Sequence, residues 1–246
     1  MVVGLMPQKK EVKAVLPSSF KDVVNLVQGR YLREKLVKLV ERPVVRIGGK
    51  VYTGLPLEAS PAAKGFHHSY DRGLVDHVVA SSKLALTLCD MVETIYGGRV
   101  NRDIVLSAII LHDIFKPLSY VKRGDGLYTM SDLAQRVDHH TLISAELINR
   151  GFPLDVVHSV LSAHGKYGPM MPRTIEGLIT HLADITDSSL VGEVQKAAQY
   201  HVRDCLGREA GRLTAKEAFN IVYMKQYYGC DGVRKAFEGV EEERLT

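Results

Sequence analysis

The sequence predicts a mainly α-helical bundle that carries one or two small β-hairpins. Most segments place apolar residues three and four positions apart, which is the spacing of one buried helix face. Two short stretches contain the turn signals of a hairpin, Gly48-Gly49 and Asp125-Gly126. A chain of 246 residues, 46% of them hydrophobic, can bury the core of one large domain with small appendages.

The first 63 residues are expected to form an N-terminal extension. Apolar spacing predicts one helix over residues 20–40 behind a cap at Ser18-Ser19, and Pro43 stops it. Residues 44–52 are predicted to form a hairpin closed by Gly48-Gly49. Residues 53–63 form a connector rich in Pro and Ala.

Residues 64–190 are expected to form the central helical domain. Helices are predicted over residues 73–96, from 101 or 102 to 116, and over 139–149 and 154–164, with a hairpin over 117–130. Another helix begins at Thr174-Ile175, and its expected core stripe is Ile175, Leu178, Ile179, Leu182 and Ile185.

Residues 191–246 are expected to form C-terminal helices packed on the core. Thr214 and Glu217 have the spacing of a capping box before a helix over 218–228. A final helix is predicted over 231–238, ahead of a charged tail.

The composition says more about the cellular compartment of the protein than about its substrate or binding partners. A net charge of +4 is compatible with a phosphate-bearing substrate but does not require one, because basic residues are spread through the chain. Cys89, Cys205 and Cys230 are odd in number and lack the close spacing of thiolate zinc sites, which favours a reducing cytoplasm. The apolar stretch Met1–Met6 is too short for the core of a signal peptide, and no membrane span is expected.

His112 and Asp113 are the most informative residues, because they interrupt the apolar run 109–117. Burying an imidazole beside a carboxylate is costly unless something compensates for the lost hydration. A metal ion would do so by accepting the imidazole lone pair and keeping the carboxylate ionised. The alternative for His112 alone is a core histidine hydrogen-bonded to backbone, but Asp113 makes a metal ligand the better interpretation.

Further polar residues lie near apolar helical sequence before and after this pair. Asp184 lies off the expected core stripe, on a small and polar strip that could line either a cleft or solvent. Together these residues could form a binuclear metal site. The predicted metal ligands are His77, His112, Asp113, His140, His164 and Asp184.

The ordered pattern of His77, His112-Asp113 and Asp184 resembles the signature of the HD-domain metal-dependent phosphohydrolase superfamily. The resemblance covers residues 64–190. The nearest subgroup in motif is the HD domain of 3′-to-5′ exoribonucleases, which carry a separate oligonucleotide-binding domain. The similarity extends into the segments 67–70, 73–77, 112–116, 164–165 and 172–177.

The resemblance implies an all-α core in which His77, His112, Asp113 and Asp184 hold one divalent metal ion. A second ion would be held by His140 and His164, with Asp113 as the bridge. Carboxylate and imidazole ligands suit Mn, Fe, Ni, Co or Zn, so the native metal stays open. A metal-activated water would then attack phosphorus without a protein nucleophile.

Three cationic or polar residues are predicted to contact the substrate. Lys116, expected to be catalytic together with Asp113, lies one turn beyond His112 and can reach a phosphoryl oxygen, although a solvated lysine at a helix end is an equal alternative. His68 and Arg173 are predicted to bind substrate from loops that border the cleft.

Two features depart from the family pattern. Phe115 occupies a position where glycine is usual, which affects how closely a substrate approaches the backbone. The N-terminal extension supplies too few strands for an oligonucleotide-binding barrel, so exoribonuclease activity does not follow from the resemblance.

The remaining histidines have more ordinary interpretations. His139 is expected to face solvent beside His140, and His158 and His201 are expected on the surface or at helix caps. His67 is left open. His181 either orients a ligand from one turn before Asp184 or is partly exposed.

The favoured function is a cytoplasmic metal-dependent phosphohydrolase that acts on a nucleotide, a cyclic nucleotide or a short oligonucleotide. The sequence does not separate a monoesterase from a diesterase, and it leaves open whether the protein forms a homo-oligomer. A di-iron oxygenase is an alternative that oxygen consumption would reveal. A noncatalytic nucleotide-binding module is another, which binding without turnover would reveal.

Overall fold

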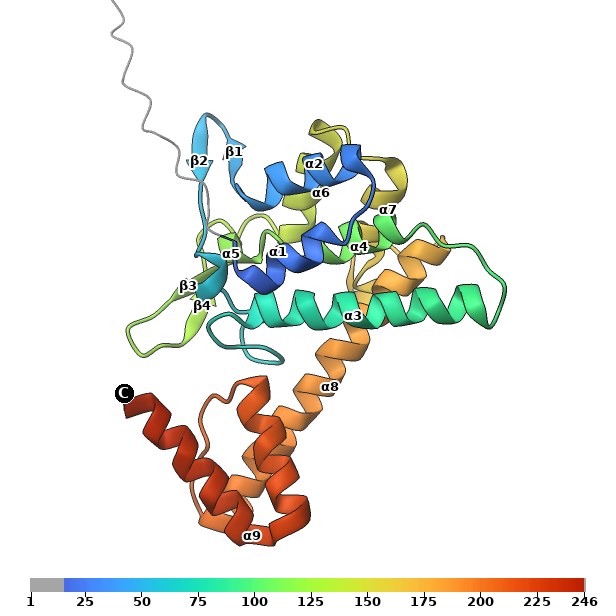
Figure 1. Ribbon diagram of the computed structural model, residues 1–246. Coiled ribbons are helices and arrows are strands. Elements are labelled where there is room, and N and C mark those ends of the chain that lie inside the picture. Colours follow the sequence, from blue (N-terminus) through green and yellow to red (C-terminus); the bar gives the residue numbers. More distant parts are fainter. Residues whose placement is uncertain (1–15, 246) are drawn as a thin grey trace, which may run out of the picture.

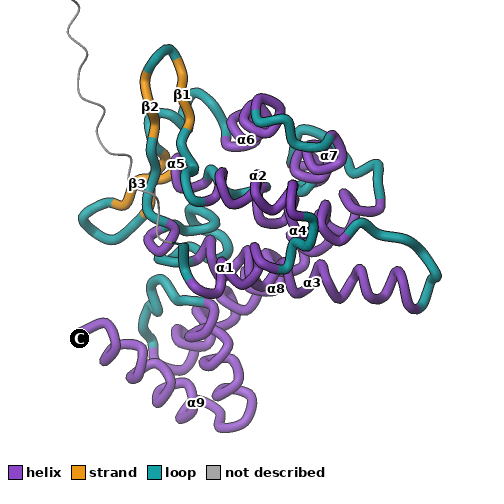
Figure 2. Tube along the Cα trace, turned by 45° about the horizontal axis from the view of Figure 1, so that its top comes forward, coloured by secondary structure: helices purple, strands orange, loops and turns teal. Residues whose placement is uncertain are grey.

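The computed structural model describes residues 16–245, so the segment Met1–Met6 lies outside the described residues. Helices dominate the structure, and two small antiparallel hairpins project from one side (Figures 1 and 2). The centre of the bundle is built by α3 (Gly73–Thr94), α4 (Arg102–Leu111), α7 (Leu154–Ser162) and the first half of α8 (Ile175–Leu206), which contact one another. The predicted fold class is therefore confirmed.

The N-terminal extension contains two helices, α1 (Ser18–Asn25) and α2 (Arg30–Val40), so the prediction of one helix over residues 20–40 was wrong. The break is stabilised by Asp103 of α4, whose carboxylate accepts hydrogen bonds from the backbone N–H groups of Gln28 (2.8 Å) and Gly29 (2.6 Å). An anionic side chain here satisfies free amides at the start of α2. No serine side chain caps α1, because Pro17 occupies the N-cap position.

Two hairpins form where the turn signals predicted them. In the first, β1 (Val45–Ile47) pairs with β2 (Lys50–Tyr52) through Gly48 and Gly49, which have φ of 55° and 79°. In the second, β3 (Tyr120–Lys122) pairs with β4 (Tyr128–Met130). The predicted first strand began too early, since residues 116–119 form the short helix α5 (Lys116–Ser119), whose early proline suits a helix start.

The metal-ligand candidates come from segments around this core. The one-turn helix Leu57–Ala59 is followed by a loop of residues 60–72, which leads into α3. After the second hairpin, α6 (His139–Asn149) and α7 lead to another single turn, Gly165–Tyr167, and then to α8. The N-terminal helices share one apolar cluster with α3, α4, α6 and α7.

The expected core stripe of α8 was wrong in four of its five positions. Ile175, Leu178, Leu182 and Ile185 are 39–47% exposed, and only Ile179 is buried. The helix instead turns its small and polar face inward, with Gly177, Thr180, Ala183, Asp184 and Asp187 buried against α3, α4 and α7. Small side chains let α8 approach the core closely, and the carboxylates face the metal-ligand candidates.

The second half of α8 leaves the central bundle and carries the C-terminal helices (Figure 1). The C-terminal segment α9 (Ala215–Leu245) is interrupted at Gly229, where φ is 63° and ψ is −147°. These helices form their own apolar cluster with the distal part of α8. Cys205 and Cys230 are joined by a disulfide, which the spacing of the cysteines did not predict. Among residues 16–245, no helix combines the length and apolar character needed to cross a bilayer.

Candidate metal centre

Four of the predicted ligands converge at the centre of the bundle. His77 comes from α3, His112 and Asp113 follow the end of α4, and Asp184 comes from the inward face of α8. His77 Nε2 lies 3.1 Å from Asp184 Oδ1 and 3.7 Å from Asp113 Oδ2. His112 Nε2 lies 3.3 Å from Asp113 Oδ2 and 3.5 Å from Asp184 Oδ1. Helices distant in the sequence thus supply two imidazoles and two carboxylates to one buried point.

The second nitrogen of each imidazole is held by a hydrogen bond. His112 Nδ1 donates to the carbonyl of Ile109 at 2.8 Å, and His77 Nδ1 donates to Asp187 Oδ2 at 2.6 Å. These bonds fix the tautomers so that both Nε2 lone pairs face the carboxylates. Asp187 was not predicted as a site residue, although its position one turn after Asp184 on the polar strip could have indicated it.

Three further histidines lie on the other side of Asp113. His164 Nε2 is 3.4 Å from Asp113 Oδ1, while its Nδ1 donates to Asp184 Oδ2 at 2.7 Å. His139 Nε2 is 3.3 Å from Asp113 Oδ1, so the expectation that His139 faces solvent was wrong. The ring of His140 stacks on that of His139 with centroids 3.9 Å apart. The first turn of α6 therefore places the rings of His139 and His140 next to His164.

The donor atoms fit one or two divalent metal ions. Several buried atoms have no hydrogen-bond partner among the described residues, and Asp113 Oδ1 is among them, whereas Asp113 Oδ2 is approached by the Lys116 ammonium. Buried polar atoms are rarely left unpaired, and metal coordination is a common explanation. The ligand atoms of His77, His112 and Asp184 lie within 4.8 Å of one another, and those of His139, His140 and His164 do as well. Within this cluster, the unpaired imidazole atoms are Nε2 of His77, His112, His139 and His140.

Burial and charge act in opposite directions on these groups. Burial disfavours the imidazolium of His112, but Asp113 and Asp184 outweigh it and raise the pKa of His112 to about 10. Burial also disfavours an ionised Asp113, yet His112 and Lys116 hold the pKa of that carboxyl well below its usual range. For His140, burial, together with His139 and His164, lowers the pKa to about 3, which leaves a neutral imidazole. The centre therefore combines ionised carboxylates with a neutral imidazole at His140, whereas His112 must lose a proton before it can bind a metal ion.

Lys116 lies in contact with the centre, not in solvent. Its Nζ is 2.6 Å from Asp113 Oδ2, and the residue is only 7% exposed. Burial would lower the pKa of Lys116, but Asp113 outweighs it and raises that pKa. The lysine also lines an open cleft of about 550 Å³. The other residues lining this cleft are Phe66, His67, His164, Tyr167, His181, Asp184, Ile185, Ser188 and Ser189.

The remaining predicted residues are placed differently from one another. His68 is 2% exposed, with Nε2 3.7 Å from Asp187 Oδ2, so it lies behind His77 and not on an open rim. Its neighbour His67 lines the cleft. Arg173 is exposed before α8, its backbone N–H donates to His158 Nε2 at 2.9 Å, and the structure does not bring it to the cleft. His181 donates from Nδ1 to the carbonyl of Ala163 at 2.7 Å.

Comparisons with known proteins give matches over this same part of the chain. The HD domain family model matches residues 74–189. Dihydroneopterin 2′,3′-cyclic phosphate phosphodiesterase from Methanocaldococcus jannaschii is 37% identical over 178 residues, which cover 72% of this chain and 71% of that protein. The 3′-5′ exoribonuclease YhaM from Listeria innocua is 34% identical over 139 residues, covering 53% of this chain and 43% of the exoribonuclease. No solved structure matches the chain.

Proposed function

The chain belongs to the HD-domain family of metal-dependent phosphohydrolases, and from this premise we propose that it hydrolyses a cyclic phosphodiester carried by a pterin or nucleoside. His77, His112, Asp113 and Asp184 would hold one divalent ion. His139, His140 and His164, together with Asp113, would hold a second. Mn, Fe, Ni, Co and Zn all suit this ligand set.

The observation that carries this proposal is the set of unpaired, buried imidazole and carboxylate atoms beside an open cleft. When bound, the metal ions supply an activated water and positive charge for the phosphoryl oxygens. The protein contributes fixed tautomers at His77 and His112 and a buried ammonium at Lys116. Lys116 is placed to donate to a nonbridging phosphoryl oxygen that enters the cleft.

The charge of the cleft favours a diester over a monoester. Among the residues that line it, Lys116 is the only lysine or arginine, and it already pairs with Asp113. A monoester dianion needs additional cations around its terminal oxygens, whereas a diester carries a single negative charge. The relative from M. jannaschii, whose name describes a cyclic phosphodiesterase, supports the same choice.

Exoribonuclease activity is less well supported. The matched segment covers less than half of the Listeria innocua enzyme, and the sheets among residues 16–245 are two two-stranded hairpins that form no barrel.

The test is hydrolysis of three esters by protein reconstituted with Mn²⁺. We expect turnover of dihydroneopterin 2′,3′-cyclic phosphate and bis(p-nitrophenyl) phosphate, and at least tenfold slower turnover of p-nitrophenyl phosphate. Asp113→Ala should abolish diester turnover, while Asp132→Ala, which changes an exposed aspartate, should not alter it. Faster turnover of the monoester, or full activity in Asp113→Ala, would contradict the proposal.

A further inference from the structure

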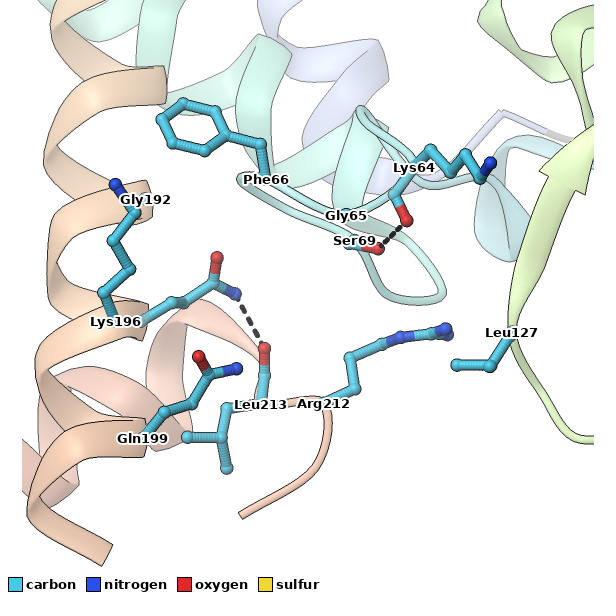
Figure 3. Close-up of a pocket in the computed structure, with 11 residues that line it drawn as sticks. Lys64, Gly65, Phe66, Ser69, Leu127, Gly192, Lys196, Gln199, Arg212 and Leu213 are labelled. Atoms are coloured by element: carbon cyan, nitrogen blue, oxygen red, sulfur yellow. Dashed lines mark hydrogen bonds between the residues drawn. The ribbon is translucent and has the colours of Figure 1, made fainter. Parts of the chain in front are cut away.

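A second pocket lies beside the metal cleft, and Phe66 lines both. Its walls are the loop of residues 64–69, the distal half of α8 and the segment around Leu213, which Figure 3 shows on three sides of one space. The cavity measures about 230 Å³. We call it the Gln195 pocket. It is lined by Lys64, Gly65, Phe66, Ser69, Leu127, Gly192, Gln195, Lys196, Gln199, Arg212 and Leu213.

The pocket is within reach of a molecule bound at the metal centre. The ring centroid of Phe66 is 5.6 Å from that of His67, and the centroid of His67 is 5.2 Å from that of His77. One histidine ring thus separates the wall of the pocket from a candidate metal ligand. Phe66 lines both spaces, so the pocket and the metal cleft share a wall.

Gln195 supplies the observation that points to a ligand. The residue is 7% exposed, and its Nε2 donates to the carbonyl of Leu213 at 2.7 Å. This bond fixes the orientation of the amide, which leaves Oε1 as a buried acceptor without a hydrogen-bond partner among the described residues. Leaving a buried acceptor unpaired is unfavourable, and an N–H group of a ligand would offset this cost.

The other side chains surround this acceptor with donors and one aromatic face. Lys64, Lys196 and Arg212 line the pocket, and no carboxylate does. The Lys196 ammonium lies 5.0 Å from the centroid of the Phe66 ring. Gly192 lets that ring lie against α8, since a Cβ there would be 2.9 Å from Phe66 Cζ. The pocket therefore suits a flat ring that presents N–H groups next to carbonyl oxygen.

We propose that the Gln195 pocket holds the 2-amino-4-oxopyrimidine ring that pterins and guanine share. A ring N–H donates to Gln195 Oε1, the ring carbonyl accepts from a surrounding cation, and Phe66 packs against the ring face. The assignment rests on the proposed function, because it gives this ring to the same substrate whose phosphate lies at the metal centre. Gln195 and Phe66 then determine which diesters the enzyme accepts.

Binding of phosphate-free compounds tests the pocket separately from catalysis. Calorimetric titration of the Mn²⁺-loaded protein should show binding of neopterin or guanosine, with adenosine at least tenfold weaker. Gln195→Met removes the acceptor while keeping the side-chain length, and Phe66→Leu removes the aromatic face without touching the Leu213 bond. Each should weaken binding at least tenfold, with thermal unfolding confirming that the variants fold. Phe219→Leu, at an exposed phenylalanine of α9, should not change binding.

Steady-state kinetics supply the second measurement. For dihydroneopterin 2′,3′-cyclic phosphate, both variants should raise KM much more than they lower kcat. The loss of kcat/KM should be at least tenfold greater than for bis(p-nitrophenyl) phosphate, which has no such ring. Equal losses for the two diesters, unchanged binding in Gln195→Met, preference for adenosine, or no binding of any of the three compounds would overturn the assignment. Wild-type protein that binds neopterin but hydrolyses no diester would support the pocket while refuting the proposed function.

Discussion

Asp187 holds the imidazole of His77 in the orientation that a metal ligand requires. We expect Asp187→Asn to weaken metal binding about 10–100-fold, because its amide accepts a weaker hydrogen bond from Nδ1 and no longer fixes the tautomer. Titration of the metal-free protein with Mn²⁺ measures the change. Asp204→Asn is the matched control, since Asp204 lies on the same helix but is 50% exposed. Unchanged metal affinity in Asp187→Asn would show that the hydrogen bond does not support the centre.

Metal affinity should also depend on pH. In the metal-free protein, burial lowers the pKa of His77, His112 and His164, but nearby carboxylates outweigh burial and raise each pKa above its ordinary value. The pKa of about 10 leaves His112 protonated at neutral pH, and the raised pKa values of His77 and His164 favour their protonated forms, so a metal ion must displace protons to bind. Affinity for Mn²⁺ should rise from about pH 6 to about pH 8, with net proton release. Calorimetry in two buffers with different ionisation enthalpies counts the protons, and an affinity that falls with pH would contradict this prediction.

The sequence predicted most residues of the candidate metal centre, but not all of them. The apolar run around His112 and Asp113 was sufficient to predict that both residues belong to the site, because burying such a pair without compensation is too costly. His139 could not be assigned to the site, because helical periodicity turns only one of two neighbouring residues inward. The apolar spacing selected His140. In the structure His139 lies 3.3 Å from Asp113, and the ligand atoms of His139, His140 and His164 lie within 4.8 Å of one another, so both neighbours reach the cluster.

Among the elements, α8 positions the site by turning its less apolar face inward. We expect Ala183→Leu to destabilise the protein by about 1–3 kcal/mol, because the 0% exposed alanine packs against α3 and α4 without room for a larger side chain. Leu182→Ala, at a position that is 40% exposed, should cost less than about 1 kcal/mol. Urea unfolding of both variants measures the difference. A larger loss of unfolding free energy for Leu182→Ala than for Ala183→Leu would instead support the orientation of α8 that the apolar spacing predicted.

The error on α8 has a physical origin. Apolar spacing identifies an amphipathic helix, but it assigns the apolar stripe to the interior by default. Here Asp184 and Asp187 face the histidines of the candidate metal centre, and the small residues beside them allow close packing. The need to turn these carboxylates toward the histidines therefore decides the orientation of α8. In the sequence, only the polar strip indicated this orientation.

At the scale of the molecule, the C-terminal helices form a second cluster on the distal half of α8, and a disulfide ties α9 to that helix. Replacing both cysteines, Cys205→Ser with Cys230→Ser, should lower the free energy of unfolding of this cluster by about 3 kcal/mol for a loop of 25 residues. Hydrogen exchange should rise in residues 215–245 and stay unchanged in α3 and α4.

A reductant provides the control for the disulfide prediction. It should bring the wild-type protein to the exchange rates of the double variant and leave the double variant itself unaffected. No response of the wild type to reductant would show that the disulfide contributes nothing to this cluster. The sequence could not indicate the pairing, because Cys205 and Cys230 meet only through the turn that returns α9 along α8.

We propose that the buried histidines and carboxylates form a metal centre that performs phosphodiester hydrolysis. The most direct measurement is the metal content and bis(p-nitrophenyl) phosphate turnover of the same samples after chelation and after return of Mn²⁺, for wild type and Asp113→Asn. We expect chelated wild type to be inactive, re-metallated wild type to bind up to two ions and recover turnover, and Asp113→Asn to bind fewer ions with at least about 100-fold lower kcat. Full turnover by chelated wild type, or by Asp113→Asn, would contradict the claim.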